Sequence, residues 1–108
     1  MKDSKINVNF RFLKLNKLQA YTLKHEVMNA SFVENSELDG FLGVVELSEF
    51  NLDEINDFYV RQQVAIEDCD IFVAITSPGN QMTVDVPNVV NRMLKYIDCK
   101  LTYSFTLA

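Results

Sequence analysis

Apolar residues follow a strand-like pattern in five segments of the chain. In residues 6–12 and 101–107 they alternate with polar residues, which predicts half-buried strands. Residues 41–47 are apolar on both faces apart from Gly43 and Glu46, which favours a central strand. Residues 70–76 give the clearest strand, with apolar residues on both faces. Residues 27–33 are ambiguous, but alternating apolar positions within them favour a further strand.

Two other segments show the three- and four-residue spacing of an amphipathic helix. The first covers residues 17–25 and follows Asn16, which is suited to capping a helix N-terminus. The second is expected from Leu52 to about Ile66. Asn51 and Glu54 have the spacing of a capping box at its start.

A third helix is expected after Pro87, because proline is favoured in the first turn of a helix. The predicted order is then β-α-β-β-α-β-α-β. We interpret the chain as one α+β domain over residues 1–108, with a ferredoxin-like βαββαβ core followed by an appended helix and a C-terminal strand. The strands that are apolar on both sides suggest that the appended helix or a partner chain covers the second sheet face.

The composition is that of an ordinary globular domain, with 48% apolar and 23% charged residues over 108 positions. The N-terminus lacks the apolar core of a signal peptide. The longest apolar run, Ile71–Ile75, is far shorter than a membrane span. These features predict a cytoplasmic protein that does not enter a membrane.

The formal net charge of −5 argues against general nucleic-acid binding, which needs many Lys and Arg contacts to phosphate. The charge is also unevenly distributed. Residues 1–24 contain six bases and one acid, whereas residues 26–60 contain nine acids and no Lys or Arg. The nine acids are Glu26, Glu34, Glu37, Asp39, Glu46, Glu49, Asp53, Glu54 and Asp57.

Part of this acidic stretch has a local explanation. Asp53 and Glu54 lie in the first turn of the predicted helix, where a carboxylate is favoured by about 0.3–1 kcal/mol. The remaining acids concentrate in a hairpin loop and at a strand-to-helix corner, and they form either a solvated surface or a protein-binding surface. The candidate partner-binding residues are Glu34, Glu37, Asp39, Glu46, Glu49, Phe50, Asp53 and Asp57, with Phe50 as an aromatic anchor.

The sequence predicts no catalytic residues, metal site or cofactor. His25 is followed by Glu26, but no nucleophile motif accompanies the pair. Cys69 and Cys99 are expected to be reduced thiols, although a redox pair remains an alternative if the fold brings them together. Two cysteines and one histidine cannot complete the usual four-ligand zinc site within one chain.

Several features together resemble the small acidic immunity proteins that bacteria make against polymorphic or contact-dependent toxins. These features are the chain length, the acidic middle from Glu34 to Asp57, the absence of catalytic motifs, and the pattern from Asp70–Ile75 through Pro87 to Tyr103–Phe105. The resemblance implies tight binding of a cognate toxin domain, often a basic nuclease, with its active site blocked. It implies no particular fold, since such families share none.

Our first hypothesis is therefore a non-enzymatic inhibitor that binds a protein partner through its acids. A second hypothesis is a self-associating structural or regulatory domain, in which the open face of the sheet pairs across a two-fold axis as a homodimer. A third is a phage-type inhibitor that mimics DNA. That role needs carboxylates aligned along one exposed face.

Overall fold

The structure is a computed structural model that describes residues 5–37, 39–77, 79 and 85–107. Within these residues the chain forms five strands and three α-helices, which confirms the mixed α+β class. In chain order they are β1 (Lys5–Leu15), α1 (Lys17–Glu26), β2 (Ala30–Asn35), β3 (Gly40–Glu46), α2 (Leu52–Arg61), the short 3-10 helix η1 (Ile66–Asp68), β4 (Cys69–Ser77), α3 (Asn88–Tyr96) and β5 (Lys100–Leu107).

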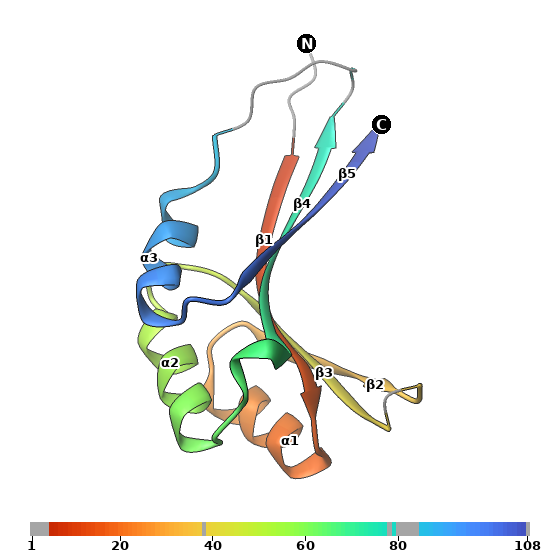
Figure 1. The fold of residues 1–108 in the computed structure, drawn as a ribbon, viewed down its shortest axis with the longest axis vertical. Coiled ribbons are helices and arrows are strands. Elements are labelled where there is room, and N and C mark those ends of the chain that lie inside the picture. Colours follow the sequence, from red (N-terminus) through yellow and green to blue (C-terminus); the bar gives the residue numbers. More distant parts are fainter. Residues whose placement is uncertain (1–4, 38, 78, 80–84, 108) are drawn as a thin grey trace.

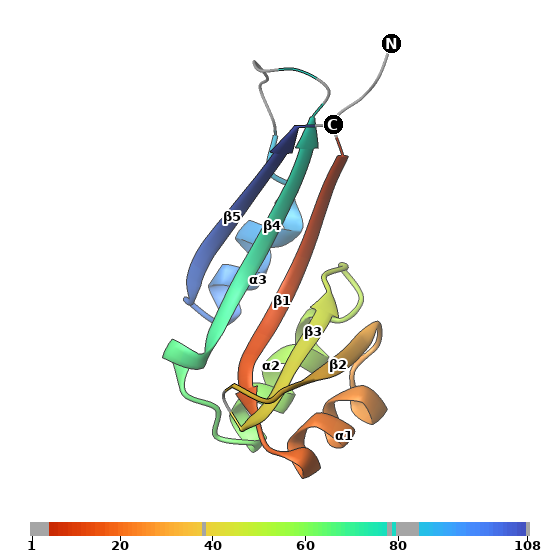
Figure 2. The same ribbon diagram turned by 90° about the vertical axis from the view of Figure 1, so that its right-hand side faces the viewer.

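The strands form one twisted sheet in the order β2-β3-β1-β4-β5 (Figure 2). Neighbouring strands from β2 to β4 are antiparallel, whereas β5 is parallel to β4. The central position predicted for the strand at residues 41–47 is confirmed, since β3 has a neighbour on each side, and β4 also lies inside the sheet. The fifth strand extends the sheet beyond β4 and forms one of its two edges.

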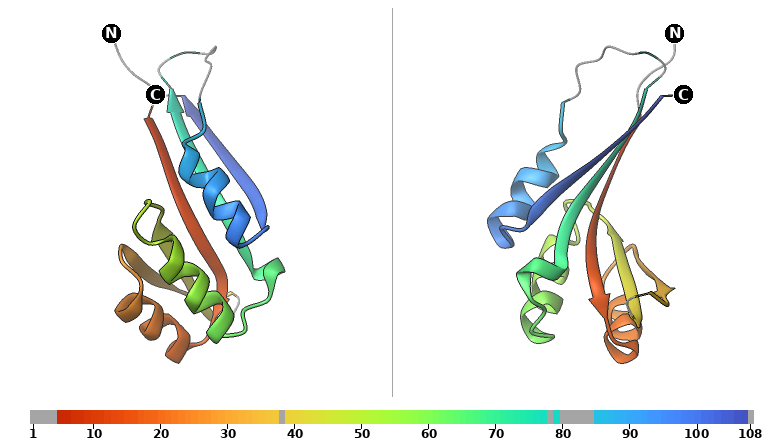
Figure 3. Two further views of the ribbon diagram at one scale, coloured as in Figure 1. Left: turned by 90° about the vertical axis from the view of Figure 1, so that its left-hand side faces the viewer. Right: turned by 45° about the vertical axis from the view of Figure 1, so that its right-hand side comes forward.

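All three helices cover the same face of the sheet (Figures 1 and 3). Each helix connects two parallel strands, and such connections are almost always right-handed. Because the pairs β1/β2, β3/β4 and β4/β5 all obey this rule, their helices are directed to one side. The prediction that the appended helix could cover the second face is therefore wrong.

The hydrophobic core lies between the helices and the sheet. Phe10 and Phe12 of β1 are fully buried, and the ring of Phe12 packs edge-on against Phe58 of α2 at 5.0 Å between centroids. Leu23 of α1 and Met93 of α3 are also fully buried. Each helix thus contributes to a single core. Among the described residues, no helix has the length and apolar character needed to cross a bilayer.

The helix boundaries follow from local chemistry. The predicted cap at Asn16 is confirmed, since its side chain accepts the Gln19 amide at 2.8 Å and Gln19 reciprocates at 2.9 Å. The prediction that the second helix reaches Ile66 is wrong, because α2 ends at Arg61. Gln63 adopts a left-handed conformation (φ 53°), and the Val64 amide bonds to the Tyr59 carbonyl in a Schellman-type termination.

Gly43 allows α1 to approach the sheet closely. A Cβ atom at this position would lie 2.5 Å from Cδ2 of Leu23 and 2.9 Å from Cδ1 of Leu15. Both leucines are buried, so neither can move aside freely. The glycine in the predicted central strand is thus a packing requirement.

We expect Gly43→Ala to lower the free energy of unfolding by about 2 kcal/mol, because the added methyl overpacks the contact between α1 and β3. Urea unfolding measures the change. Gly79→Ala is the matched control, since nothing lies within 4 Å of a Cβ there, and its effect should stay within about 0.5 kcal/mol. Equal effects of the two substitutions would contradict the packing role of Gly43.

Candidate functional site

All eight candidate partner-binding residues are exposed, but they do not form one cluster. The first group is the acidic hairpin at the β2–β3 turn, which comprises Glu34, Glu37 and Asp39. The second is the acidic corner between β3 and α2, which comprises Glu46, Glu49, Phe50 and Asp53. Strand β3 separates the two groups by about 20 Å. Asp57 lies one turn further along α2.

The geometry of the turn explains in part why an acid occurs in the acidic hairpin. Asp39 has a φ of 51°, and its amide bonds to the Ser36 carbonyl. Aspartate tolerates this left-handed conformation better than most residues. A groove beside the turn is lined by Glu34, Asp39 and the base Lys17, so the local charge there is mixed. These features make the hairpin the weaker of the two candidate binding surfaces.

The acidic corner is held by Asn51, which is completely buried. Its side-chain amide donates to the carbonyls of Glu46 at 2.8 Å and Met28 at 3.0 Å, and its Oδ1 accepts the Ser48 amide at 3.0 Å. The predicted capping box with Glu54 is wrong, because this side chain does not cap the helix. The Asn51 side chain instead joins the end of β3 to the loop before β2, by binding the carbonyl of Glu46 and the carbonyl of Met28.

The acids at this corner contact basic and hydroxyl groups of α3. Arg92 lies 3.6 Å from Glu49, and Tyr96 donates a 2.7 Å hydrogen bond to Asp53. That hydrogen bond raises the pKa of Tyr96. A separate ion pair joins Glu26 to Arg61 at 2.6 Å, and Glu54 accepts the Met28 amide at 3.0 Å. The negative charge of residues 26–60 is therefore partly neutralised by Arg61 and Arg92, which lie outside this stretch in the sequence but close to it in space.

Phe50 is the most exposed large apolar residue in the described part of the chain, with 80% of its surface accessible. Its backbone is nevertheless fixed, because its amide donates to the Ser48 hydroxyl at 3.1 Å and the next residue is the buried Asn51. The structure thus presents an aromatic side chain on a rigid corner between acidic residues. This arrangement can bind an apolar pocket with a basic rim.

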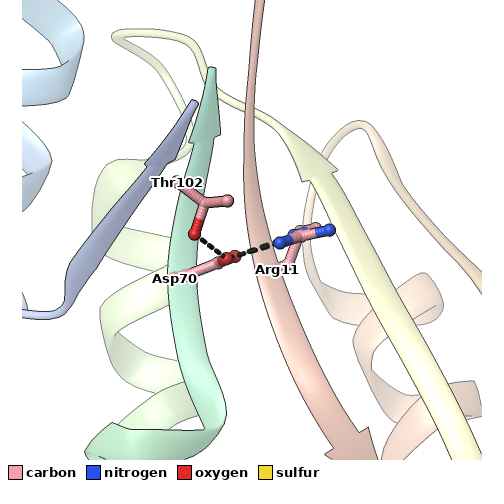
Figure 4. Close-up of polar contacts among 3 residues, drawn as sticks. All are labelled: Arg11, Asp70 and Thr102. Atoms are coloured by element: carbon pink, nitrogen blue, oxygen red, sulfur yellow. Dashed lines mark hydrogen bonds and ion pairs between the residues drawn. The ribbon is translucent and has the colours of Figure 1, made fainter. Parts of the chain in front are cut away.

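A second polar site lies on the sheet face without helices (Figure 4). Asp70 of β4 is 1% exposed, and Arg11 of β1 binds both of its carboxylate oxygens, with 2.8 Å from Nε to Oδ1. Thr102 of β5 donates to the same carboxylate at 2.7 Å. The Arg11 guanidinium also stacks on the ring of Phe72 at 4.2 Å.

The sequence pattern did not predict this cluster. Two residues offered a signal: Asp70 is an acid at the start of an apolar strand, and Arg11 is a base on the polar face of another strand. That they pair depends on the sheet register, which the sequence does not give. Burial acts to raise the pKa of Asp70, yet the hydrogen bonds from Arg11 and Thr102, together with the positive charges of Arg11 and Lys100, outweigh it and hold the pKa below its ordinary value. Arg11 and Thr102 together form hydrogen bonds to both oxygens of the Asp70 carboxylate. We therefore interpret the cluster as a structural contact that holds β1, β4 and β5 together.

Cys69 and Cys99 are both buried and lie side by side, since each precedes a residue of the Asp70–Lys100 pair in the parallel strands β4 and β5. Burial raises the pKa of Cys69 to about 12 and that of Cys99 to about 11. Thiols with such values form little thiolate and are poor nucleophiles. Their burial indicates a packing role.

Within the described residues, no group of three or more His, Cys, Asp or Glu side chains is arranged to hold a metal ion. Comparison with protein-family models, curated proteins and solved structures gives no match to this chain.

We expect Asn51→Ala to lower the free energy of unfolding by about 3 kcal/mol, because it removes a fully buried side chain together with its hydrogen bonds to two carbonyls and one amide. Asn56→Ala is the control, since it makes the same change in the middle of α2. It should cost less than about 0.5 kcal/mol, because alanine favours helix. Chemical denaturation of both variants tests the assignment, which similar losses would contradict.

We expect Asp70→Asn to destabilise the protein by about 2 kcal/mol at pH 7, because it weakens a charge-assisted network. The lowered pKa means that the carboxylate stabilises the fold fully above its unfolded value, near pH 4. This contribution is lost as the pH falls through the folded value.

The difference between wild type and Asp70→Asn should therefore shrink over the acid range, from about pH 5 downward. Urea titrations at several pH values measure it, and Thr102→Val provides a reference that removes one hydrogen bond and keeps the carboxylate. A difference that stays constant across this range would show that the charge of Asp70 does not stabilise the fold.

Proposed function

We propose that this chain is a non-enzymatic protein-binding domain that inhibits a partner with a basic surface. The observation that carries the proposal is Phe50, which is 80% exposed on a corner fixed by Asn51. Exposed aromatic residues in rigid surroundings are frequent anchors of protein interfaces. The acids on either side would form the polar rim.

The rigidity of the corner supports this choice. A surface loses less conformational entropy on binding when its backbone is already ordered. The three side-chain hydrogen bonds of Asn51 provide such order next to the anchor. The acidic hairpin lacks an aromatic anchor of comparable exposure, and the base Lys17 lines the groove beside it.

The charge arrangement supports a basic partner. Glu49 is held by Arg92 at 3.6 Å, and both side chains are more than half exposed. Exposed pairs of this kind contribute little to stability, so a Lys or Arg of the partner could replace Arg92 at small cost. Attraction between the acids and a basic surface would mainly speed association.

We propose further that the partner is a toxin domain and that the protein is of the immunity type, acting in the cytoplasm. The cytoplasmic assignment is supported by two free thiols, which are usual in a reducing compartment. The separation of the acids into two groups does not favour mimicry of DNA, which needs a continuous row of carboxylates.

We also propose a ferredoxin-like assignment for the segment Lys5–Ser77. The antiparallel order β2-β3-β1-β4, with α1 and α2 on one face, supports it. The parallel strand β5 and helix α3 lie outside that arrangement and extend it.

Affinity capture from cells that produce the protein, followed by binding measurements with the purified partner, tests the proposal. We expect Phe50→Ala to weaken binding by tenfold or more, about 1.4 kcal/mol or greater. Glu49→Lys should slow association, most strongly at low ionic strength.

Leu18→Ala is the matched control, because Leu18 is a comparably exposed apolar residue (76%) on α1. It should leave affinity unchanged. A partner that binds Phe50→Ala as tightly as wild type, or associates with Glu49→Lys at the wild-type rate in low salt, would refute binding through the corner.

A further inference from the structure

Strand β5 has β4 on one side and no strand neighbour among the described residues on the other. Its apolar side chains face the helix side of the sheet but remain exposed: Leu101 is 37%, Tyr103 54%, Phe105 49% and Leu107 54% accessible. Figure 1 shows that β5 begins beside the C-terminal end of α3 and then extends past the other end of this helix. The strand therefore has unpaired backbone groups along one side and an exposed apolar stripe.

The opposite edge of the sheet differs. Strand β2 is six residues long, contains the acid Glu34, and packs beside α1, whose Tyr21 contacts Phe32 of β2 at 5.0 Å. Such features protect an edge from pairing with other strands. Strand β5 has eight residues, a continuous register with β4, and one charge at its start, Lys100. It lacks the protection that β2 has.

The sequence of β5 is nearly palindromic in chemical character. From Leu101 to Leu107 it reads Leu-Thr-Tyr-Ser-Phe-Thr-Leu, which is symmetric about Ser104 apart from the exchange of one aromatic residue for another. An antiparallel pair of identical strands places residues at equal distances from the two-fold axis opposite one another. With Ser104 on the axis, each apolar residue faces an apolar residue and each hydroxyl faces a hydroxyl.

We propose that a second copy of this chain pairs with β5 in antiparallel fashion, with the two-fold axis at Ser104. Leu101 then faces Leu107 of the partner subunit, and Tyr103 faces Phe105 of the partner subunit. The two five-stranded sheets become one continuous sheet. Cross-strand aromatic and aliphatic pairs of this kind stabilise antiparallel strands.

Charge supports a second copy as the occupant. Strand β5 contains no acid, and its single base lies outside the symmetric segment, so two copies pair without placing like charges opposite one another. The hydroxyl of Thr102 is already bound to Asp70 at 2.7 Å, which aligns β5 against β4 before pairing. We expect a contact between two single strands to bury less than the roughly 800 Å² per partner of a standard interface, and therefore expect a dissociation constant of about micromolar order.

Disulfide trapping tests the position of the axis. In Ser104→Cys the two introduced thiols face each other across the axis at about 5 Å between Cβ atoms, a separation close to that of a disulfide. Diamide, which accepts the two electrons and two protons, should convert this variant to a covalent dimer. In Thr106→Cys the corresponding thiols are about 13 Å apart, and this control should remain uncrosslinked.

Wild-type protein treated with diamide is the control for the native cysteines. Because Cys69 and Cys99 are buried, wild type should form no covalent dimer. Failure of Ser104→Cys to crosslink, or equal crosslinking of the two variants, would overturn the proposed pairing.

Sedimentation equilibrium from about 1 to 100 μM tests self-association of the unmodified chain. Wild type should dimerise in this range. Tyr103→Lys and Phe105→Glu should each weaken the dimer about tenfold or more, because each removes both aromatic pairs. A mixture of the two variants should associate better than either alone, since one new Lys–Glu pair and one aromatic pair form.

A monomeric wild type at 100 μM would overturn the proposal, as would variants that dimerise like wild type. Circular dichroism should show both variants folded, because the two side chains are about half exposed. Phe50→Ala lies away from β5 and should dimerise like wild type. Loss of dimerisation in Phe50→Ala would place the interface at the acidic corner and refute pairing through β5.

Discussion

The right-handed connection between parallel strands determines most of this structure. Three connections of the same hand put α1, α2 and α3 on one face of the sheet, where they bury Phe10, Phe12 and the rest of the core. The same constraint leaves the other face without a helix from the described part of the chain. It also places β5 at an edge, because the last connection moves outward from β4. The exposed surfaces of the protein follow from this one-sided arrangement.

The face without helices is stabilised by polar contacts instead of a second apolar layer. Asp70 would be costly to bury alone, but Arg11 and Thr102 bind its carboxylate and connect β1, β4 and β5. Asn51 has a related role at the corner between β3 and α2, where it binds backbone groups that neither element uses. The Asp70 cluster and the Asn51 hydrogen bonds each join segments that are distant in sequence. Each therefore favours one arrangement of these segments over others, in addition to its contribution to the free energy of unfolding.

The extent to which the sequence predicted these features depends on the range of the interactions. Alternation and helical spacing located the strands and helices, and the cap at Asn16 is a local contact that spacing predicts well. The misassignment of Asn51 arose because its true partners, such as the Met28 carbonyl, are distant in sequence. The helix end at Arg61 depends on a left-handed Gln63, a residue type with no strong preference for that conformation. The acidic stretch could not reveal that Arg92 and Tyr96 lie against it.

The two binding surfaces that we propose are separate, since one is the aromatic anchor at the acidic corner and the other is the unprotected edge strand β5. The edge follows most directly from the one-sided fold, and amide hydrogen exchange at two protein concentrations tests it best. We expect the amides of residues 101–107 to exchange more slowly at high concentration, while those of the protected edge β2 do not change. Exchange of β5 that is independent of concentration would contradict pairing through this edge.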